Sequence, residues 1–233
     1  MLPERRAVLF DLDDTLYPLQ QFLLSGFRAV AARVAQDRGH EYERTLGLLI
    51  AAYDSDRGRE LDVLAHRLSL PAGAVAALVD VIRTHQPDIR LSAATTAVLM
   101  AMRRGWRIGV VTNGRPDIQA RKITALGLSP MVDAIVFAAE HGSGAGKPDA
   151  EPFLEAARVL GVGPEQTVFV GDDQRCDIAG AQALGMSTIW LPTSVSRRAG
   201  VDPVPASLVL SSLSLVPEAA ARLVASRRST YVA

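Results

Sequence analysis

The chain has 233 residues and a mass of 24.9 kDa, and 48% of its residues are hydrophobic. This length and composition support one sizeable core, which excludes a disordered protein, a collagen-like repeat and a disulfide-stabilised miniprotein. The 25 basic residues balance the 25 acidic ones, which argues against a general binder of nucleic acids or anionic membranes. The one cysteine, Cys176, has no partner for an internal disulfide and is typical of a reducing compartment.

No segment of the sequence has the pattern of a targeting signal or a membrane span. The first apolar run, residues 7–12, is short and contains Asp11, so it fails as a signal peptide. No later run reaches the roughly 18 apolar residues that a spanning helix requires. We therefore expect a cytoplasmic protein.

Short apolar runs recur along the chain, and each predicts a buried β-strand. They cover residues 7–11, 106–112, 134–137, 167–171, 187–191 and 207–210. Helical patterns separate most of them, at residues 92–104, 116–126, 149–160 and 177–184. This alternation of strands and helices predicts an α/β fold with a parallel sheet.

The stretch 18–88 breaks this alternation, because it contains helical patterns and no strand-like run. Apolar residues at helical spacing start near Leu19, Leu46, Leu61 and Val75, which predicts about four helices. We expect residues 18–88 to form a helical lobe inserted into a core made of residues 1–17 and 89–233. Pro18 and the stretch Gln86-Pro87-Asp88 are the expected hinges.

Polar residues follow the predicted strands at their carboxyl ends, where open α/β sheets bind ligands. They are Asp11, Asp13 and Asp14 after the first strand, Thr112 and Asn113 after the second, Lys147 before the helix at 149, Asp172 and Asp173 after the fourth strand, and Asp177 at the start of the next helix. We expect these loops to form one pocket.

The residue types in this pocket predict phosphoryl chemistry. Clustered carboxylates repel one another unless a cation joins them, and hard oxygen ligands suit Mg²⁺. Asp11 and Asp13 are two apart in an extended segment, so both can face the pocket in different roles. One carboxylate can attack phosphorus, while the other protonates the leaving oxygen and later activates water.

Only two of the 25 basic residues are lysines, Lys122 and Lys147. In a chain that otherwise uses arginine, a retained lysine indicates a role that arginine fills badly, such as a compact point charge.

Together these motifs resemble the haloacid dehalogenase superfamily of phosphohydrolases. They read Phe10-Asp-Leu-Asp-Asp-Thr-Leu-Tyr-Pro18, Val111-Thr-Asn-Gly114, Gly146-Lys-Pro-Asp149 and Val170-Gly-Asp-Asp-Gln-Arg-Cys-Asp177. The resemblance implies a three-layer Rossmann-like core with an inserted all-helical cap of the C1 type, and a first strand lying between the second and the fourth. The stretch 112–119 with Lys122 is similar to the branch of N-acylneuraminate-9-phosphatase and pyrimidine 5'-nucleotidases.

The resemblance also implies roles for the site residues. Asp11 would be the nucleophile and a Mg²⁺ ligand, and Asp13 the general acid and base, with its backbone carbonyl on the metal. Thr112 and Asn113 would hold the phosphoryl group, and Lys147 would bridge Asp11 and phosphate.

In the same pattern, Asp172 would complete the metal site, and Asp177 would lie behind it near Lys147. Asp173 stands where the family often has Ser, Thr or Asn, so whether Asp172 alone or also Asp173 contacts the metal stays open. Asp177 is as consistent with a helix cap as with a site role. Two arginines of the helical lobe, Arg57 and Arg59, fit solvated loop charges or recognition of an anionic substrate.

We expect a Mg²⁺-dependent phosphatase that hydrolyses a small phosphorylated metabolite through an aspartyl-phosphate on Asp11. A phosphomutase of the same superfamily is the alternative. A dehalogenase is less favoured, since Asp13 has no use there, and so is a non-catalytic binding module, since no key residue is missing. The sequence predicts neither the substrate nor the oligomeric state.

Overall fold

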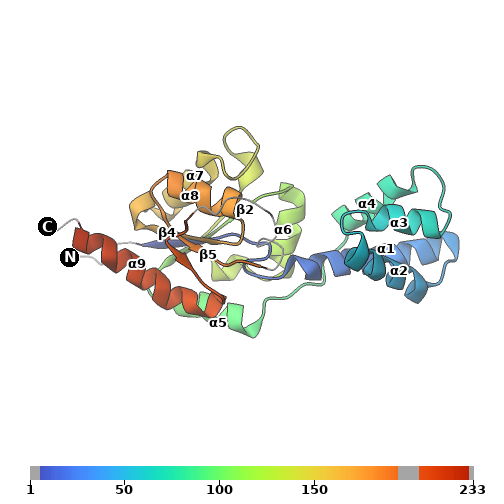
Figure 1. Cartoon of the computed structure of the whole chain (residues 1–233), viewed down its shortest axis with the longest axis horizontal. Helices are drawn as coiled ribbons and strands as arrows, with labels where there is room; N and C mark the ends of the chain where they lie inside the picture. The colour runs from blue at the N-terminus through green and yellow to red at the C-terminus, as the bar shows by residue number, and fades with distance from the viewer. Residues whose placement is uncertain (1–5, 194–204, 231–233) are drawn as a thin grey trace. The chain divides into compact units, whose positions relative to one another are not determined.

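The computed structural model describes residues 6–193 and 205–230. The chain divides into two compact units (Figure 1). The core unit comprises Met1–Pro18 and Arg90–Ala233, and the helical unit comprises Leu19–Ile89. Each unit has its own hydrophobic core, as described below.

The core unit is built on a parallel sheet of six strands in the order β3-β2-β1-β4-β5-β6. The strands are β1 (Ala7–Phe10), β2 (Arg107–Thr112), β3 (Ala134–Phe137), β4 (Thr167–Gly171), β5 (Ser187–Trp190) and β6 (Leu208–Val209). The predicted parallel α/β fold is confirmed, and β1 lies between β2 and β4 as expected. The last strand is shorter than its apolar run, because only two of its residues pair with β5.

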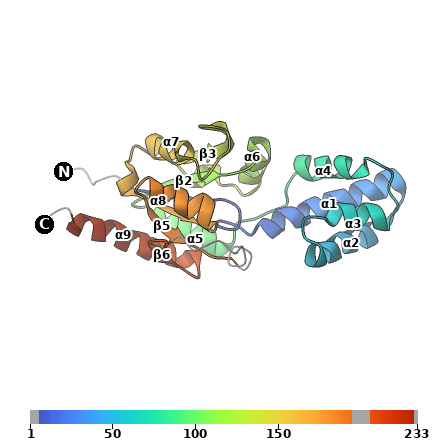
Figure 2. The same cartoon turned by 45° about the horizontal axis from the view of Figure 1, so that its top comes forward.

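Helices cover both faces of this sheet, which explains the continuous apolar strands. Helices α7 (Ala150–Leu160) and α8 (Gly180–Ala183) lie on one face, and α5 (Ala93–Met102) and α9 (Val216–Thr230) on the other (Figures 1 and 2). All four residues of β1 and all five of β4 are buried. The rings of Phe153 and Phe169 meet edge to face at 5.0 Å between helix and sheet.

The other helical elements described in the core unit lie between strands or, for the last turn, after β6. They are α6 (Pro116–Ala125), a π-helix (Gln174–Ala179) and 3-10 turns at Ser129–Met131, Ala138–Glu140, Pro164–Gln166 and Leu213–Leu215. The sequence predicted a helix from 177, whereas the structure starts it at Gln174. The reason is a cap: the Asp173 carboxylate accepts hydrogen bonds from the backbone N–H groups of Arg175 and Cys176.

The helical unit consists of α1 (Leu19–Arg38), α2 (Tyr42–Ser55), α3 (Glu60–Arg67) and α4 (Ala74–Thr84). Their apolar faces enclose a separate core, in which Phe27, Leu49 and Leu64 are buried. Across residues 6–193 and 205–230, no helix combines the length and hydropathy that crossing a membrane requires.

Candidate active site

The site forms where three adjacent strands end. Asp11 follows β1, Thr112 ends β2, and Asp172 follows β4. Because β1 pairs with both β2 and β4, these three ends lie side by side at one edge of the sheet. The Asp11 N–H donates to the Val170 carbonyl (2.9 Å), which carries the β1–β4 pairing one residue further.

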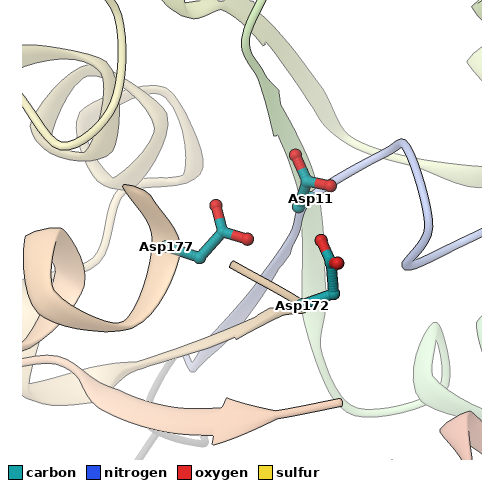
Figure 3. Close-up of side chains that lie close together, drawn as sticks. All are labelled: Asp11, Asp172 and Asp177. Carbon is teal, nitrogen blue, oxygen red and sulfur yellow. The ribbon is translucent and has the colours of Figure 1, made fainter. Parts of the chain in front are cut away.

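Three carboxylates converge at this edge (Figure 3). Asp11, Asp172 and Asp177 each present an oxygen atom, and these atoms lie within 4.8 Å of one another. Asp11 and Asp177 are buried, with 7% and 1% of their surfaces exposed. Three negative charges this close in a poorly hydrated place repel strongly, so the arrangement requires compensating positive charge.

Part of that charge comes from Lys147, whose side chain is 1% exposed. Its Nζ donates to Asp11 Oδ1 (2.6 Å), Asp177 Oδ1 (2.7 Å) and the Val111 carbonyl (2.9 Å). All three ammonium hydrogens therefore have acceptors within the protein. Lys147 joins Asp11 to Asp177, and a phosphoryl oxygen that contacts it has to share one of these hydrogens.

The absence of a side chain at Gly171 allows Asp177 to approach the sheet. A Cβ at position 171 would lie 2.2 Å from Asp177 Oδ2, which is far closer than any atoms can pack. The same oxygen accepts a hydrogen bond from the Asp173 N–H (3.1 Å). Asp177 is thus held from both of its oxygens, one by Lys147 and one by the backbone. The helix cap is therefore Asp173, and Asp177 lies against Lys147.

Burial and mutual repulsion change the acidity of these groups. Burial raises the pKa of the Asp11 carboxyl to about 7; the Lys147 ammonium opposes this rise, and the Asp177 carboxylate adds to it. Burial, together with the charges of Asp11 and Asp177, raises the pKa of Asp172 to about 8. Burial favours a neutral Lys147, but its two carboxylate partners outweigh this and raise its pKa above the usual value.

These residues fit a divalent cation. The donor set is hard carboxylate oxygen, which suits Mg²⁺, and burial together with the neighbouring carboxylates raises the pKa of both Asp11 and Asp172. Of the three converging carboxylates, Asp11 and Asp172 are the ones that would hold the ion, since both Asp177 oxygens already accept hydrogen bonds. The contact of the Asp13 backbone carbonyl with the metal stays a prediction. The Asp173 carboxylate is used as a helix cap.

We expect Mg²⁺ to raise the melting temperature of the wild-type protein and to have little effect on Asp172→Asn. A ligand present at about 100 times its Kd stabilises by about 2.7 kcal/mol, which corresponds to a shift of roughly 5–10 °C for a chain of this size. The matched control is Asp173→Asn, which preserves the cap because asparagine accepts the same bonds, and which should retain the shift. A normal shift in Asp172→Asn would exclude Asp172 as a ligand.

The melting temperature measured without Mg²⁺ should also depend on pH. The raised pKa of Asp172 means that the folded state binds this proton more tightly than the unfolded state does. The stability of the metal-free protein should therefore fall as the pH rises from about 4 to 8. In Asp172→Asn this fall should be smaller, because asparagine carries no charge at high pH. The metal-free variant should therefore melt above the wild type at pH 8.

The second predicted acid, Asp13, lies in a network that the sequence analysis did not describe. Its carboxylate accepts hydrogen bonds from Lys122 Nζ to both oxygens (2.8 and 2.8 Å), from Gln119 Nε2 (3.0 Å) and from Tyr17 Oη (2.5 Å). Burial and the adjacent Asp13 charge raise the pKa of Tyr17, which keeps its hydroxyl as a donor. Lys122 and Lys147, the two lysines of the chain, therefore both bind site carboxylates.

Thr112 and Asn113 lie beside this network at the end of β2. Gln119 Nε2 also donates to Thr112 Oγ1 (2.6 Å), while the Thr112 hydroxyl itself donates a long hydrogen bond to the Asn113 carbonyl (3.4 Å), which a bound acceptor would have to replace. The Asn113 amide pairs with the backbone of Lys147 through two hydrogen bonds, of 2.8 and 3.0 Å. Asn113 thus fastens the Lys147 loop to β2, and its contact with a phosphoryl group stays a prediction.

Three further residues discussed above, Cys176, Arg57 and Arg59, are not part of the cluster of converging carboxylates. Burial and the Asp173 carboxylate raise the pKa of the Cys176 thiol to about 11, which favours the protonated thiol over the thiolate. Arg57 and Arg59 are exposed residues of the helical unit, and the Arg57 guanidinium stacks 4.3 Å from the ring centre of Tyr53.

A sequence model of the haloacid dehalogenase-like hydrolases matches residues 5–185 of the chain. The chain therefore belongs to this family and is a hydrolase. A glyceraldehyde 3-phosphate phosphatase of Methanopyrus kandleri is 35% identical over 195 residues, which cover 79% of this chain and 82% of that protein. A phosphoserine phosphatase of Thermus thermophilus is 36% identical over 91 residues, which cover 39% of this chain and 36% of that protein.

Solved structures agree on the fold. A 2-haloacid dehalogenase from Pseudomonas syringae pv. Tomato superposes with a TM-score of 0.61 at 27% identity, covering 94% of this chain and 99% of that one. An HAD phosphatase from Thermococcus onnurineus superposes with a TM-score of 0.58 at 21% identity, covering 92% and 97%. The finer resemblance to N-acylneuraminate-9-phosphatase and pyrimidine 5'-nucleotidases stays a prediction.

Proposed function

We propose that the chain is a Mg²⁺-dependent phosphatase that hydrolyses a small phosphomonoester through an aspartyl-phosphate on Asp11. The observation that carries this proposal is the buried Lys147 ammonium bonded to both Asp11 and Asp177, with Asp172 beside them at the carboxyl edge of the sheet. This arrangement combines a carboxylate nucleophile with a compact positive charge and oxygen ligands for a cation. The relatives named as phosphatases support the same reading.

Asp11 and Asp172 would hold the Mg²⁺, which when bound would supply positive charge to neutralise the phosphoryl oxygens and the carboxylates. Added positive charge also favours the ionised form of Asp11, whose pKa is about 7 in the metal-free protein. An ionised Asp11 is required because only the carboxylate is nucleophilic.

In the first step, an Asp11 carboxylate oxygen attacks phosphorus and forms the acyl phosphate. The bond from phosphorus to the ester oxygen breaks, and protonated Asp13 gives its proton to that oxygen, so an alcohol leaves. The Thr112 hydroxyl, which Gln119 orients, donates to a phosphoryl oxygen. The Lys147 ammonium stabilises the negative charge at Asp11 and at the phosphoryl group.

In the second step, ionised Asp13 takes a proton from a water molecule, whose oxygen attacks the phosphorus of the acyl phosphate. The bond between phosphorus and the Asp11 oxygen breaks, which releases inorganic phosphate and regenerates the Asp11 carboxylate. Asp13 ends the cycle protonated, ready for the next ester. The two steps balance as hydrolysis of one ester by one water.

The substrate class follows from the relatives rather than from any residue of the site. Glyceraldehyde 3-phosphate is the first ester to test, because relatives at 35% and 30% identity are named as phosphatases of that compound. A dehalogenase is less favoured, although a structure of 27% identity is named as one. A departing halide needs no proton, so Asp13 and the four hydrogen bonds that hold it would have no use.

The experiment is phosphate release from a panel of small phosphomonoesters, measured with Mg²⁺ and with a chelator. We expect release that depends on Mg²⁺, with a three-carbon sugar phosphate among the best esters. Failure to release phosphate from any ester, in a folded protein that binds Mg²⁺, would overturn the phosphatase. Transfer of the phosphoryl group to another position of the same substrate, without release, would identify a phosphomutase.

A further inference from the structure

The Asp13 carboxylate is held far more tightly than a freely moving side chain would be. Four hydrogen bonds reach it from three side chains, and two of them come from the Lys122 ammonium. The Lys122 side chain is 5% exposed, whereas that of Asp13 is 25% exposed. The carboxyl group is therefore fixed by hydrogen bonds from buried side chains, while part of it stays accessible to solvent.

Two of the three donors come from one face of α6. Gln119 and Lys122 are three residues apart, so they project from the same side of the helix. Both are buried, with 2% and 4% of their surfaces exposed. Gln119 Nε2 donates to Thr112 Oγ1 as well as to Asp13, so this helix face connects the acid to the hydroxyl at the end of β2.

A buried lysine is costly unless it serves a specific interaction. Burying an ammonium group and a carboxylate loses the hydration of both, and an apolar pair of similar volume is often as stable or more stable. Stability alone therefore does not explain why Lys122 occupies this place. Its compact ammonium group contacts both carboxylate oxygens at 2.8 Å, and the planar guanidinium of arginine would require more room.

We propose that Lys122 and Gln119 are positioning residues of the reaction, which fix the orientation of the Asp13 carboxyl group toward the leaving oxygen. The inference rests on the proposed phosphatase function, in which Asp13 donates a proton to that oxygen. Proton transfer depends steeply on the placement of the acid. The hydrogen bonds from Lys122 and Gln119 would orient the carboxyl group relative to the leaving oxygen. Gln119 has the additional task of orienting the Thr112 hydroxyl.

The test compares two esters whose leaving groups differ in their need for a proton. An alkyl phosphate, the best one in the panel, releases an alkoxide that must be protonated, whereas p-nitrophenyl phosphate releases a stable phenolate. The measured quantity is kcat/KM, since it reports the steps through departure of the alcohol or phenol. The ratio of the two values does not depend on how much of a variant is folded.

For Lys122→Met we expect kcat/KM to fall by about 100-fold with the alkyl phosphate and by less than about 3-fold with p-nitrophenyl phosphate. Gln119→Leu should show the same difference between esters and also a higher KM for both, because the Thr112 hydroxyl loses its partner. The matched control is Arg121→Met on the same helix, which removes an exposed ion pair with Asp117 and should change neither value.

An equal loss with both esters in Lys122→Met, including complete loss in a folded protein, would overturn the proposal. Where Lys122→Met does not fold, Tyr17→Phe removes one donor from the same carboxylate without changing charge. It should give a smaller loss that is again confined to the alkyl ester, and an equal loss with both esters would overturn the proposal there too. Wild-type protein that hydrolyses neither ester would instead contradict the phosphatase function itself.

Discussion

Asp11→Asn is expected to lower Mg²⁺-dependent phosphate release by at least about 10⁴-fold, because an amide cannot attack phosphorus. The substitution preserves shape and removes one of three converging negative charges. The variant should therefore fold, with a melting temperature no lower than that of the wild type. Phosphate release and thermal melting of the two proteins are the measurements.

Asp13→Asn is the matched comparison, because it removes the acid and base while leaving the nucleophile. With p-nitrophenyl phosphate it should form the acyl phosphate without needing an acid, and then fail to hydrolyse it. The protein should carry a phosphoryl group that hydroxylamine removes, and Asp11→Asn should carry none. Substantial turnover by Asp11→Asn would place the nucleophile elsewhere and contradict the aspartyl-phosphate route.

Lys147→Met is expected to be the most destabilising of these substitutions, by about 3–5 kcal/mol, because it leaves two buried carboxylates without their cation. Lys147 is 4% exposed and donates to both Asp11 and Asp177. Activity should fall by at least about 10³-fold in the fraction that folds, since the charge at the phosphoryl group is lost as well. Denaturant unfolding and phosphate release measure the two effects.

The loss of stability in Lys147→Met should depend on pH. The Lys147 ammonium lowers the pKa of Asp11, so its removal lets the folded-state pKa rise further above the unfolded value. The folded variant then gains protons as the pH falls, and the difference from wild type should narrow between pH 8 and pH 5. Arg158→Met, which breaks an exposed pair with Glu155 on α7, is the control and should change little. A deficit that is constant with pH would mean that the carboxylates are not its cause.

Much of the core could be predicted because its strands are buried on both faces. The runs at 134–137 and 167–171 form β3 and β4 with the same boundaries. The position of β1 between β2 and β4 was implied by the resemblance and is present in the sheet. The helix before β5 was predicted to start at 177 and starts at Gln174, because its start depends on a side-chain cap at Asp173.

The network around Asp13 could not be read from the order of residues. Gln119 and Lys122 lie 106 and 109 positions after Asp13 in the sequence, and no local pattern relates such distant residues. Two signals pointed to these residues: Lys122 and Lys147 are the two lysines among 25 basic residues, and the stretch 112–119 with Lys122 carried part of the family resemblance. Neither signal indicated that Asp13 is the partner of Gln119 and Lys122.

The sequence by itself determined the parallel α/β class, the helical insertion and the loops that carry reactive residues. It could do so because strand burial, helical periodicity and residue type are local properties. Only the tertiary structure decided between Asp172 and Asp173 as the carboxylate facing Asp11, and connected Lys147 to Asp177 and Lys122 to Asp13. Such choices depend on distances of a few ångströms between side chains from separate strands and helices, which exist only once the sheet has brought those elements together.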